Sequence, residues 1–275
     1  MILDYHMHLR LGESDDVEMT DHSLEAVERY VAAARAAGID EIAITEHVYY
    51  FAETRDFWHM PFEIERCICD VGPYLAAIDV AKRSALPVKL GIEVDYTPGR
   101  EDEMGAWLGR YSWDVVLGSV HFVDGFGIDS RPRLIDEIGV EEAWRRYFAV
   151  LRDAAASGLF DSLAHPDLVR MWGDRPARKV QEELFAAFAD DVAAAGVCIE
   201  VSTRGLLRPV AEPYPDRRLL AMCRERDVPV TLASDAHSVD RVGWRFEEAL
   251  ELLRGAGYET VTMFEQREPQ QVPVG

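Results

Sequence analysis

Short apolar runs alternate with longer amphipathic segments along almost the whole chain. Seven of these runs have the length of buried strands, and each is followed by a polar loop or a helical pattern. Parallel strands need a long crossover connection, so this order predicts parallel strands joined by right-handed crossovers. The expected strands span residues 1–3, 42–44, 88–92, 113–118, 160–163, 197–201 and 228–232.

Helical periodicity fills most of the intervals between these runs. Ser23 fits an N-cap and Gly38 fits a C-terminal stop for the first helix, at about 23–37. The aromatic-rich residues 49–62 are too irregular for an ordinary connection and predict a lid or pocket wall. Further helices are expected at about 73–84, 140–156, 177–195, 215–226 and 244–254.

The end of the chain shows a weaker pattern. A β-like run at 260–264 is followed by polar residues 266–275, which we expect to be a frayed tail. No Gly/Ser linker or low-complexity block interrupts the alternation of strands and helices. We therefore expect a single domain over residues 1–265 and a polar tail over 266–275.

Histidines and carboxylates recur at the ends of the expected strands. In a closed parallel barrel all these ends meet on one face, whereas an open sheet would spread them too far apart for one cluster. The pattern therefore favours an α/β fold closed into a seven-unit barrel, with its site at the carboxyl ends of the strands. The residues concerned are His6, His8, His47, Glu93, His121, His165, Asp235 and His237.

His6 and His8 lie two residues apart, so both rings project to the same side of a strand. Two imidazoles on one face form half a site for Zn²⁺, Mn²⁺ or Fe²⁺, although an isolated His-x-His is more often structural. Recurrence at strand after strand is hard to explain by core packing. Since one Zn²⁺ needs three or four ligands, eight candidates indicate two or three ions.

The charge composition restricts the classes of molecule that this protein can bind. The net charge of −21 and the pI near 4.7 disfavour nucleic acid and anionic membranes, which require clustered Lys and Arg. A small phosphorylated substrate stays possible, because exposed charges are screened within roughly 8–10 Å. Four cysteines without zinc-ribbon spacing, and the lack of a long apolar run, predict a soluble cytoplasmic protein without disulfides. The sequence leaves the oligomeric state open.

Six motifs between residues 6 and 237 resemble the PHP (polymerase and histidinol phosphatase) family, and specifically its histidinol-phosphate phosphatase branch. As an ordered set spanning most of the chain they are highly specific. The loop Gly205-Leu206-Leu207-Arg208-Pro209 with Pro213-Tyr214-Pro215 is a weaker match to the same branch. The motifs are His6-Met7-His8, Glu46-His47, Gly91-Ile92-Glu93, Gly118-Ser119-Val120-His121, Ala164-His165-Pro166 and Ser234-Asp235-Ala236-His237.

This resemblance implies a distorted (β/α)7 TIM-like barrel with a trinuclear site. By analogy the first metal would be bound by His6, His8, Glu93 and Asp235, and the second by Glu93, His121 and His165. His47 and His237 would bind a third metal. The family usually adds one ligand for it after His-x-His, where this chain offers only Asp15, Asp16 or His22.

The resemblance also implies phosphomonoester hydrolysis, with L-histidinol phosphate converted to L-histidinol and phosphate by a metal-bridging hydroxide. Uncatalysed hydrolysis of phosphate monoesters is so slow that acceleration reaches about 10²¹-fold. Clustered divalent ions lower the pKa of water and neutralise phosphoryl oxygens. In this hypothesis Asp235 or His237 handles the proton, and Arg208, with Arg170 or Arg204, binds the phosphate.

Three other interpretations compete with this one. The first is a PHP phosphoesterase acting on another small phosphate, such as a nucleotide or a sugar phosphate. The second is a metal-dependent amidohydrolase, which usually pairs His-x-His with a lysine at a strand end, whereas Lys89 here lies inside its strand. The third is a non-catalytic metal-binding module, against which the single compact domain and the full ligand set argue.

Overall fold

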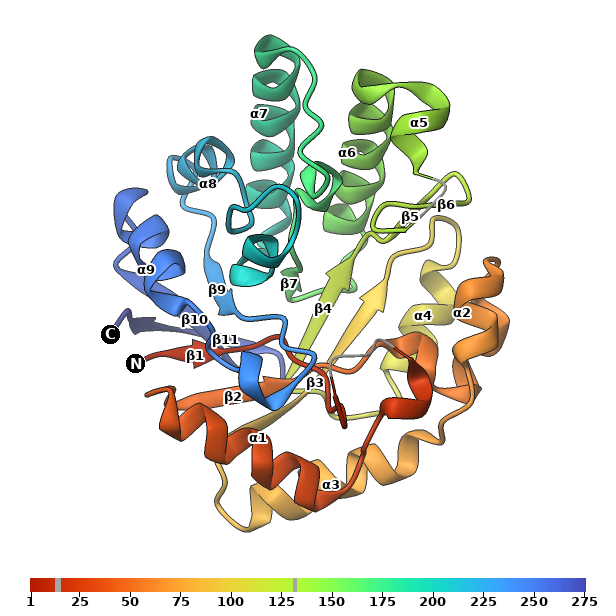
Figure 1. Ribbon diagram of the computed structural model, residues 1–275, viewed down its shortest axis with the longest axis vertical. Helices are drawn as coiled ribbons and strands as arrows, with labels where there is room; N and C mark the ends of the chain where they lie inside the picture. The colour runs from red at the N-terminus through yellow and green to blue at the C-terminus, as the bar shows by residue number, and fades with distance from the viewer. Residues whose placement is uncertain (13–15, 131–132) are drawn as a thin grey trace.

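The computed structural model describes residues 1–12, 16–130 and 133–275. Its centre is a seven-stranded parallel sheet in the order β1-β2-β3-β4-β7-β8-β9 (Figure 1). All seven predicted strands are confirmed, with ends that differ by a few residues. The strands are β1 (Leu3–Asp4), β2 (Glu41–Ile44), β3 (Val88–Asp95), β4 (Val115–Ser119), β7 (Ser162–Leu163), β8 (Cys198–Ser202) and β9 (Val230–Ala233).

The first and last strands of this sheet lie side by side, so the sheet closes into a barrel. The Tyr5 amide donates to the Leu232 carbonyl at 2.9 Å, and the His8 amide donates to the Ala236 carbonyl at 2.9 Å. Met7 and Ala236 also form an isolated parallel bridge. The predicted closed (β/α) barrel is therefore confirmed.

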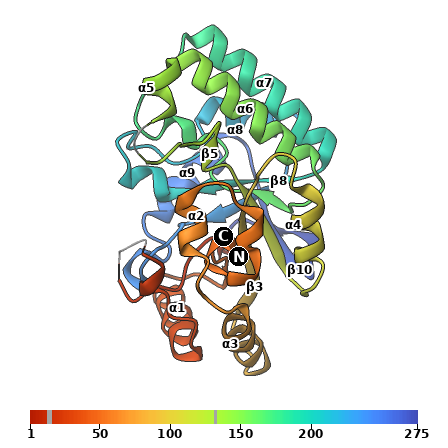
Figure 2. The same cartoon turned by 90° about the vertical axis from the view of Figure 1, so that its right-hand side faces the viewer.

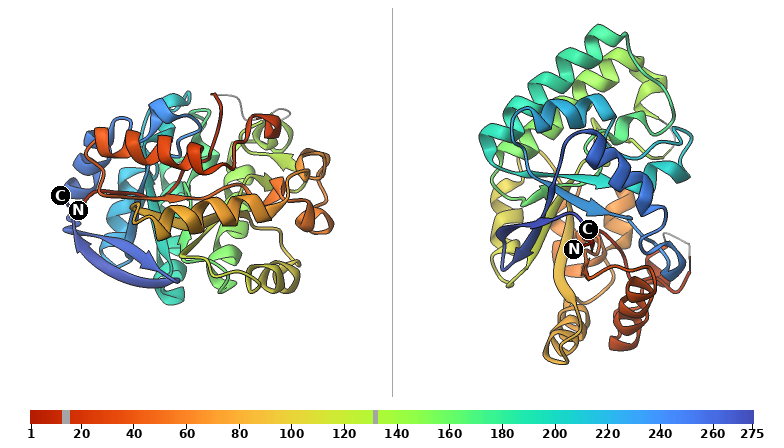
Figure 3. Two further views of the ribbon diagram at one scale, coloured as in Figure 1. Left: turned by 90° about the horizontal axis from the view of Figure 1, so that it is seen from below. Right: turned by 90° about the vertical axis from the view of Figure 1, so that its left-hand side faces the viewer.

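Helices surround the barrel on its outside (Figures 2 and 3). The first helix begins as predicted, because the Ser23 side chain accepts from the Ala26 amide, and its buried face includes Val27 and Val31. None of the described helices is both long and apolar enough to cross a membrane. The surrounding helices are α1 (Leu24–Ala36), α3 (Val71–Arg83), α4 (Glu101–Leu108), α6 (Val140–Ala156), α7 (Arg178–Ala195), α8 (Arg217–Arg224) and α9 (Phe246–Gly255).

The connections at the carboxyl ends of the strands carry small elements that the sequence pattern did not predict. The aromatic segment after β2 forms the short helices η2 (Val48–Tyr50), η3 (Ala52–Phe57) and α2 (Pro61–Arg66). The connection after β4 contains a hairpin, β5 (Phe122–Val123) with β6 (Phe126–Gly127), and the helix α5 (Leu134–Ile138). Both connections lie over the end of the barrel that is formed by the carboxyl ends of the strands. We call this end the metal end.

The opposite end of the barrel is covered by an antiparallel hairpin, β10 (Thr260–Glu265) with β11 (Glu268–Pro273), and we call it the hairpin end (Figure 3). The expected frayed tail over 266–275 is therefore wrong. Its polar residues pair with β10 over six residue pairs, and the turn between the strands is anchored by the Arg267 amide, which donates to the Asp114 carbonyl at 2.9 Å.

Charged side chains at the hairpin end are paired with one another. Lys89 forms ion pairs with Glu265 and, at 3.5 Å, with Glu41. The Arg267 guanidinium lies 3.0 Å from the Asp161 carboxylate. These pairs fasten the hairpin to the strands that it covers.

Both chain termini lie together at this end, beside the hairpin (Figure 1). The Met1 ammonium donates to the Pro273 carbonyl at 2.9 Å, and the Gly275 amide donates to the Met1 carbonyl at 3.3 Å. The termini are therefore on the far side of the barrel from the strand ends that carry the candidate ligands.

Candidate metal centre

The eight candidate ligands converge at the metal end. All of them are buried except His121, which is partly exposed. Six strands supply these side chains, so the site depends on barrel closure. His6 and His8 follow β1, His47 follows β2, Glu93 lies in β3, His121 follows β4, His165 follows β7, and Asp235 and His237 follow β9.

Four of these side chains form one compact donor set. His6 Nε2 and His8 Nε2 lie 3.4 Å and 3.7 Å from Glu93 Oε2. The same two nitrogens lie 3.7 Å and 3.6 Å from Asp235 Oδ1. Ligands at about 2.1 Å around a tetrahedral ion are roughly 3.4 Å apart, so the spacing of this set suits one divalent cation.

The Glu93 carboxylate faces two places at once. Its Oε2 atom belongs to the set just described, while Oε1 lies 3.2 Å from His165 Nε2 and 3.8 Å from His121 Nε2. Glu93, His121 and His165 form a second candidate ligand group. A carboxylate with one oxygen toward each of two groups has the geometry of a bridging ligand.

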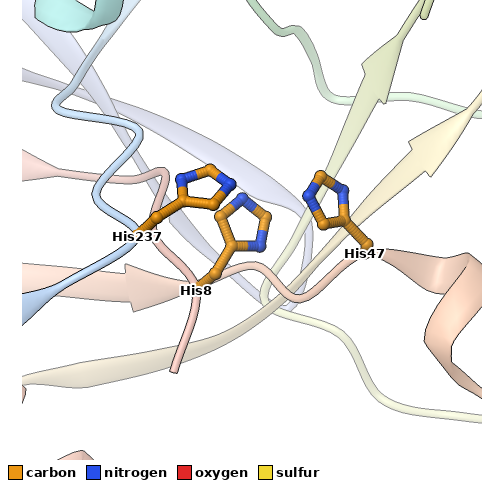
Figure 4. A group of neighbouring side chains, drawn as sticks. All are labelled: His8, His47 and His237. Atoms are coloured by element: carbon orange, nitrogen blue, oxygen red, sulfur yellow. The ribbon is translucent and has the colours of Figure 1, made fainter. Parts of the chain in front are cut away.

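A third group consists of His8, His47 and His237 (Figure 4). The rings of His8 and His47 are stacked at a centroid separation of 4.1 Å, and those of His8 and His237 are 4.4 Å apart. This group shares His8 with the first donor set. It contains only imidazoles, so its ligand set carries less negative charge than the other two.

Buried polar atoms without partners mark the centre of the cluster. His6 Nε2 and His8 Nε2 are buried and have no hydrogen-bond partner in the described chain, while Glu93 Oε2 and His47 Nδ1 contact each other at 2.7 Å. Unpaired buried polar atoms are costly and rare, and here two point at a common space. Imidazole nitrogens and hard carboxylate oxygens together fit Zn²⁺, Mn²⁺ or Fe²⁺.

Local backbone geometry helps to place three of the ligands. A Cβ atom on Gly91 would lie 2.5 Å from Thr45 Cγ2 and 2.8 Å from the Ile44 carbonyl, so only glycine lets β3 pack this closely on β2 before Glu93. His165 and Asp235 adopt positive φ angles of 28° and 50°. Such strained conformations in non-glycine residues concentrate at functional sites.

The electrostatics of the cluster favour the ligand forms of Glu93 and His47. Burial alone would raise the pKa of Glu93, but the neighbouring imidazoles, above all His6, hold it well below its ordinary value. Burial, with the charge of His8, lowers the pKa of His47 to about 4. An ionised carboxylate and a neutral imidazole are the forms that bind metal ions.

Carboxylates behind the histidines form a layer that the sequence interpretation missed. His6 Nδ1 lies 2.7 Å from Glu200 Oε2, and His121 Nδ1 lies 2.6 Å from Asp95 Oδ1. Such pairs fix the orientation of each ring and leave Nε2 for a metal ion. Asp95 follows Glu93 by two residues on one strand face, which is a usable signal, whereas Glu200 is simply a carboxylate inside an apolar strand.

Two of the extra ligands expected after His8, Asp16 and His22, belong to none of the candidate ligand groups among the described residues. Asp15 lies outside the described residues, and Asp16 is exposed. His22 lies between the rings of Phe51 and Tyr74, with Nε2 3.5 Å from Glu46 Oε1.

Comparison with known proteins agrees with this geometry. The model of the PHP domain family matches residues 5–204. The chain belongs to the PHP family. The family resemblance predicted from the sequence motifs is thereby confirmed.

Curated relatives that this PHP protein matches over nearly its whole length are named as histidinol-phosphatases. A probable histidinol-phosphatase of Deinococcus radiodurans is 33% identical over 272 residues, which cover 95% of this chain and 96% of the relative. The histidinol-phosphatase of Lactococcus lactis subsp. lactis is 21% identical over 267 residues, which cover 95% of this chain and 94% of that protein.

A solved structure shares the fold. The crystal structure of histidinol phosphate phosphatase from Lactococcus lactis, complexed with zinc, L-histidinol and phosphate, matches with a TM-score of 0.78 at 20% identity and covers 98% of both chains. A second structure, of a putative histidinol phosphatase from Listeria monocytogenes, matches with a TM-score of 0.72 at 23% identity, over 89% of this chain and 98% of the other.

A pocket lies over the candidate metal ligands of this PHP barrel, with about 610 Å³ of space that includes open solvent at its mouth. One wall is basic, with Arg204 and Arg208, and Arg204 Nε lies 3.7 Å from Asp235 Oδ2. The rest of its lining beyond the ligands is mainly aromatic and apolar. These residues are Tyr49, Phe62, Phe122, Leu168 and the exposed Asp129.

The third predicted arginine, Arg170, does not line this pocket. It is fully buried, with Nε 2.6 Å from Asp167 Oδ2 and Nη1 2.6 Å from Glu212 Oε2, and it also donates to the Pro213 carbonyl. Its guanidinium joins the loop after β7 to the loop after β8. Because these partners occupy its donors, Arg170 is not available to a ligand in the pocket.

Proposed function

We propose that this protein is a metal-dependent phosphomonoesterase that hydrolyses L-histidinol phosphate to L-histidinol and inorganic phosphate. The observation that carries the proposal is the two-sided placement of Glu93, with one oxygen toward His6 and His8 and the other toward His165. Relatives named as histidinol-phosphatases over nearly the whole chain support the choice of substrate.

We assign two or three divalent cations, Zn²⁺, Mn²⁺ or Fe²⁺, to the three ligand groups. Bound there, they would lower the pKa of water and neutralise the charge of the phosphoryl oxygens. The first two groups contain the carboxylates Glu93 and Asp235. The all-imidazole group, with His47 and His237, would bind its ion more weakly because it lacks an anionic ligand.

The arginine wall supplies the anion-binding part of the proposed site. Arg204 and Arg208 lie on the same pocket as the metal ligands, and a guanidinium binds phosphate oxygens through forked hydrogen bonds. Asp235 joins the two parts, since Oδ1 faces the histidines and Oδ2 faces Arg204. A phosphate between them would be oriented toward the metal ligands.

Proton transfer is assigned to Asp235 or His237, which lie side by side over the cluster. His237 Nδ1 is 3.3 Å from Asp235 Oδ1. Both residues line the pocket, so either can reach the leaving oxygen of a bound ester or the water that attacks it. A His or Asp positioned in this way typically contributes about 10²–10⁴-fold to the rate.

Another small phosphate ester is the alternative substrate that the pocket allows. An amidohydrolase is less well supported, because Lys89 pairs with Glu41 and Glu265 at the hairpin end rather than joining the ligands. A nucleotide or a sugar phosphate would meet the same arginines and aromatic wall at this end of the barrel. Neither carries the amino alcohol group of L-histidinol phosphate.

The test is release of inorganic phosphate from a panel of monoesters by protein loaded with Zn²⁺, Mn²⁺ or Fe²⁺, with L-histidinol phosphate in the panel. We expect the highest kcat/KM with L-histidinol phosphate and loss of activity after chelation. A higher kcat/KM with a nucleotide or sugar phosphate would make that ester the substrate in place of L-histidinol phosphate. No phosphate release from any monoester would reject the proposed function.

A further inference from the structure

A second cleft adjoins the metal pocket across Phe122, whose side chain lines both. It lies between α2, the end of β3 and the β5–β6 hairpin. Much of its lining is apolar, with Tyr96 and Pro98 beside Phe122. Three carboxyl side chains also line it: Asp124, which forms an ion pair with Arg146 at 2.7 Å, and two others, Glu63 and Asp95.

The last two carboxyl groups are deeply buried, with relative exposures of 3% for Glu63 and 2% for Asp95. Asp95 Oδ1 is occupied by His121 Nδ1, but Asp95 Oδ2 is buried and has no hydrogen-bond partner in the described chain. Within the same described part, Glu63 forms no ion pair with a lysine, arginine or histidine. Buried carboxyl groups ordinarily have such a partner.

The titration behaviour of Glu63 agrees with a missing partner. Burial, followed by the negative charge of Asp95, raises the pKa of Glu63 to about 9. A positive charge placed beside such a carboxyl group lowers its pKa and favours the ionised form. A cationic ligand group would therefore suit both carboxyl groups together.

We propose that Glu63 and Asp95 form a subsite for a small organic cation, and that it receives the protonated nitrogen on the organic part of the phosphate ester. The inference rests on the proposed function and deepens it. One imidazole separates the two regions, because His121 directs Nδ1 to Asp95 and Nε2 toward Glu93. Phe122 and Tyr96 add aromatic faces that attract cations.

The two ends of the combined site then have opposite charge preferences. Arg204 and Arg208 favour the phosphate, whereas the carboxyl pair favours an ammonium or imidazolium. An ester that carries both charges is bound at two points, and an ester without a cation is bound only at the phosphate. The carboxyl pair would therefore determine substrate specificity rather than the chemistry at phosphorus.

The test is the variant Glu63→Gln, which keeps the shape of the side chain and removes its charge. Loss of a charged hydrogen-bond partner is expected to raise KM for L-histidinol phosphate about tenfold or more, and to weaken competitive inhibition by L-histidinol equally. Turnover of p-nitrophenyl phosphate, which has no cation, is expected to stay within about twofold. Glu65→Gln, an exposed change on the same helix, is the control and is expected to have no effect.

Two results would overturn the inference. Equal losses with both esters would mean that Glu63 supports the metal centre itself, and no loss with either would mean that the cleft binds no cation. Glu63→Asp is a second variant, since it retains the charge and is expected to restore part of the preference for L-histidinol phosphate. If the wild type fails to hydrolyse L-histidinol phosphate, the proposed function fails, while inhibition of p-nitrophenyl phosphate turnover by L-histidinol still tests the subsite.

Discussion

The two ends of the barrel bury charged side chains in opposite ways. At the hairpin end charged side chains of opposite sign face one another, as with Lys89 and Glu265 or Arg267 and Asp161. At the metal end the nitrogens His6 Nε2 and His8 Nε2, which have no hydrogen-bond partner in the described chain, converge toward one space beside Glu93. The comparison indicates that charge at the hairpin end stabilises the fold, whereas charge at the metal end is arranged for a ligand that the protein must bind.

Removal of the Glu93 carboxylate, the proposed bridging ligand, should give the largest effect. In Glu93→Gln both ligand groups lose a shared anionic ligand, and loss of several kcal/mol of transition-state stabilisation lowers kcat/KM by roughly 10³-fold. The metal content of the purified variant, measured by elemental analysis, should fall as well. Activity within tenfold of the wild type would show that Glu93 is not a ligand.

A substitution in the layer of carboxylates behind the histidines should give the second-largest effect on activity. Glu200→Gln removes the charge beside His6 Nδ1 but keeps a polar side chain, and we expect metal affinity to fall about 10–100-fold. Activity should recover when metal is added in excess, which distinguishes a positioning role from a direct one. Glu225→Gln, at an exposed position, serves as the control.

A variant at the hairpin end should change stability and leave catalysis intact. Arg267→Ala leaves the mostly buried Asp161 carboxylate without its partner, and we expect urea denaturation to show a loss of about 1–3 kcal/mol. Burial already raises the pKa of Asp161. The loss should therefore be smaller below about pH 4, where that carboxyl group is protonated and needs no partner.

The smallest effect is expected for Lys89→Met. This change removes one partner of an ion pair whose carboxylates, on Glu41 and Glu265, are partly exposed, so water can solvate them and we expect a loss of stability of only about 1 kcal/mol. Phosphatase kcat/KM should be unchanged. A loss of activity of a hundredfold would mean that Lys89 takes part in the site after all and would remove the distinction between the two ends.

Sequence reasoning identified the candidate ligands, which the structure brings together, because histidines at strand ends are unusual and barrel closure gathers all those ends. It missed Glu200 because a single carboxylate inside the apolar strand β8 has no periodic signature. It mistook β11 for a tail because those residues are polar and the hairpin turn at Gln266 and Arg267 lacks the usual Asn-Gly or Asp-Gly sequence. Only tertiary contacts, such as the bond from the Arg267 amide to Asp114, specify that turn.

Arg170 illustrates the limit of assigning arginines from sequence. An arginine that binds phosphate and an arginine that links two loops look alike in the amino-acid sequence, because both occur in loops that follow strands. Its contacts with Asp167 and Glu212 distinguish the two roles, and they depend on loops that only the fold brings together.

The adjacent termini have a practical consequence. Met1 and Gly275 meet beside the hairpin, on the side of the molecule away from the pocket. An affinity tag, a fused carrier or an attachment to a solid support at either terminus would leave the entrance for small molecules open. A short peptide joining the two termini would also permit circular permutation, with new ends opened in a surface loop elsewhere.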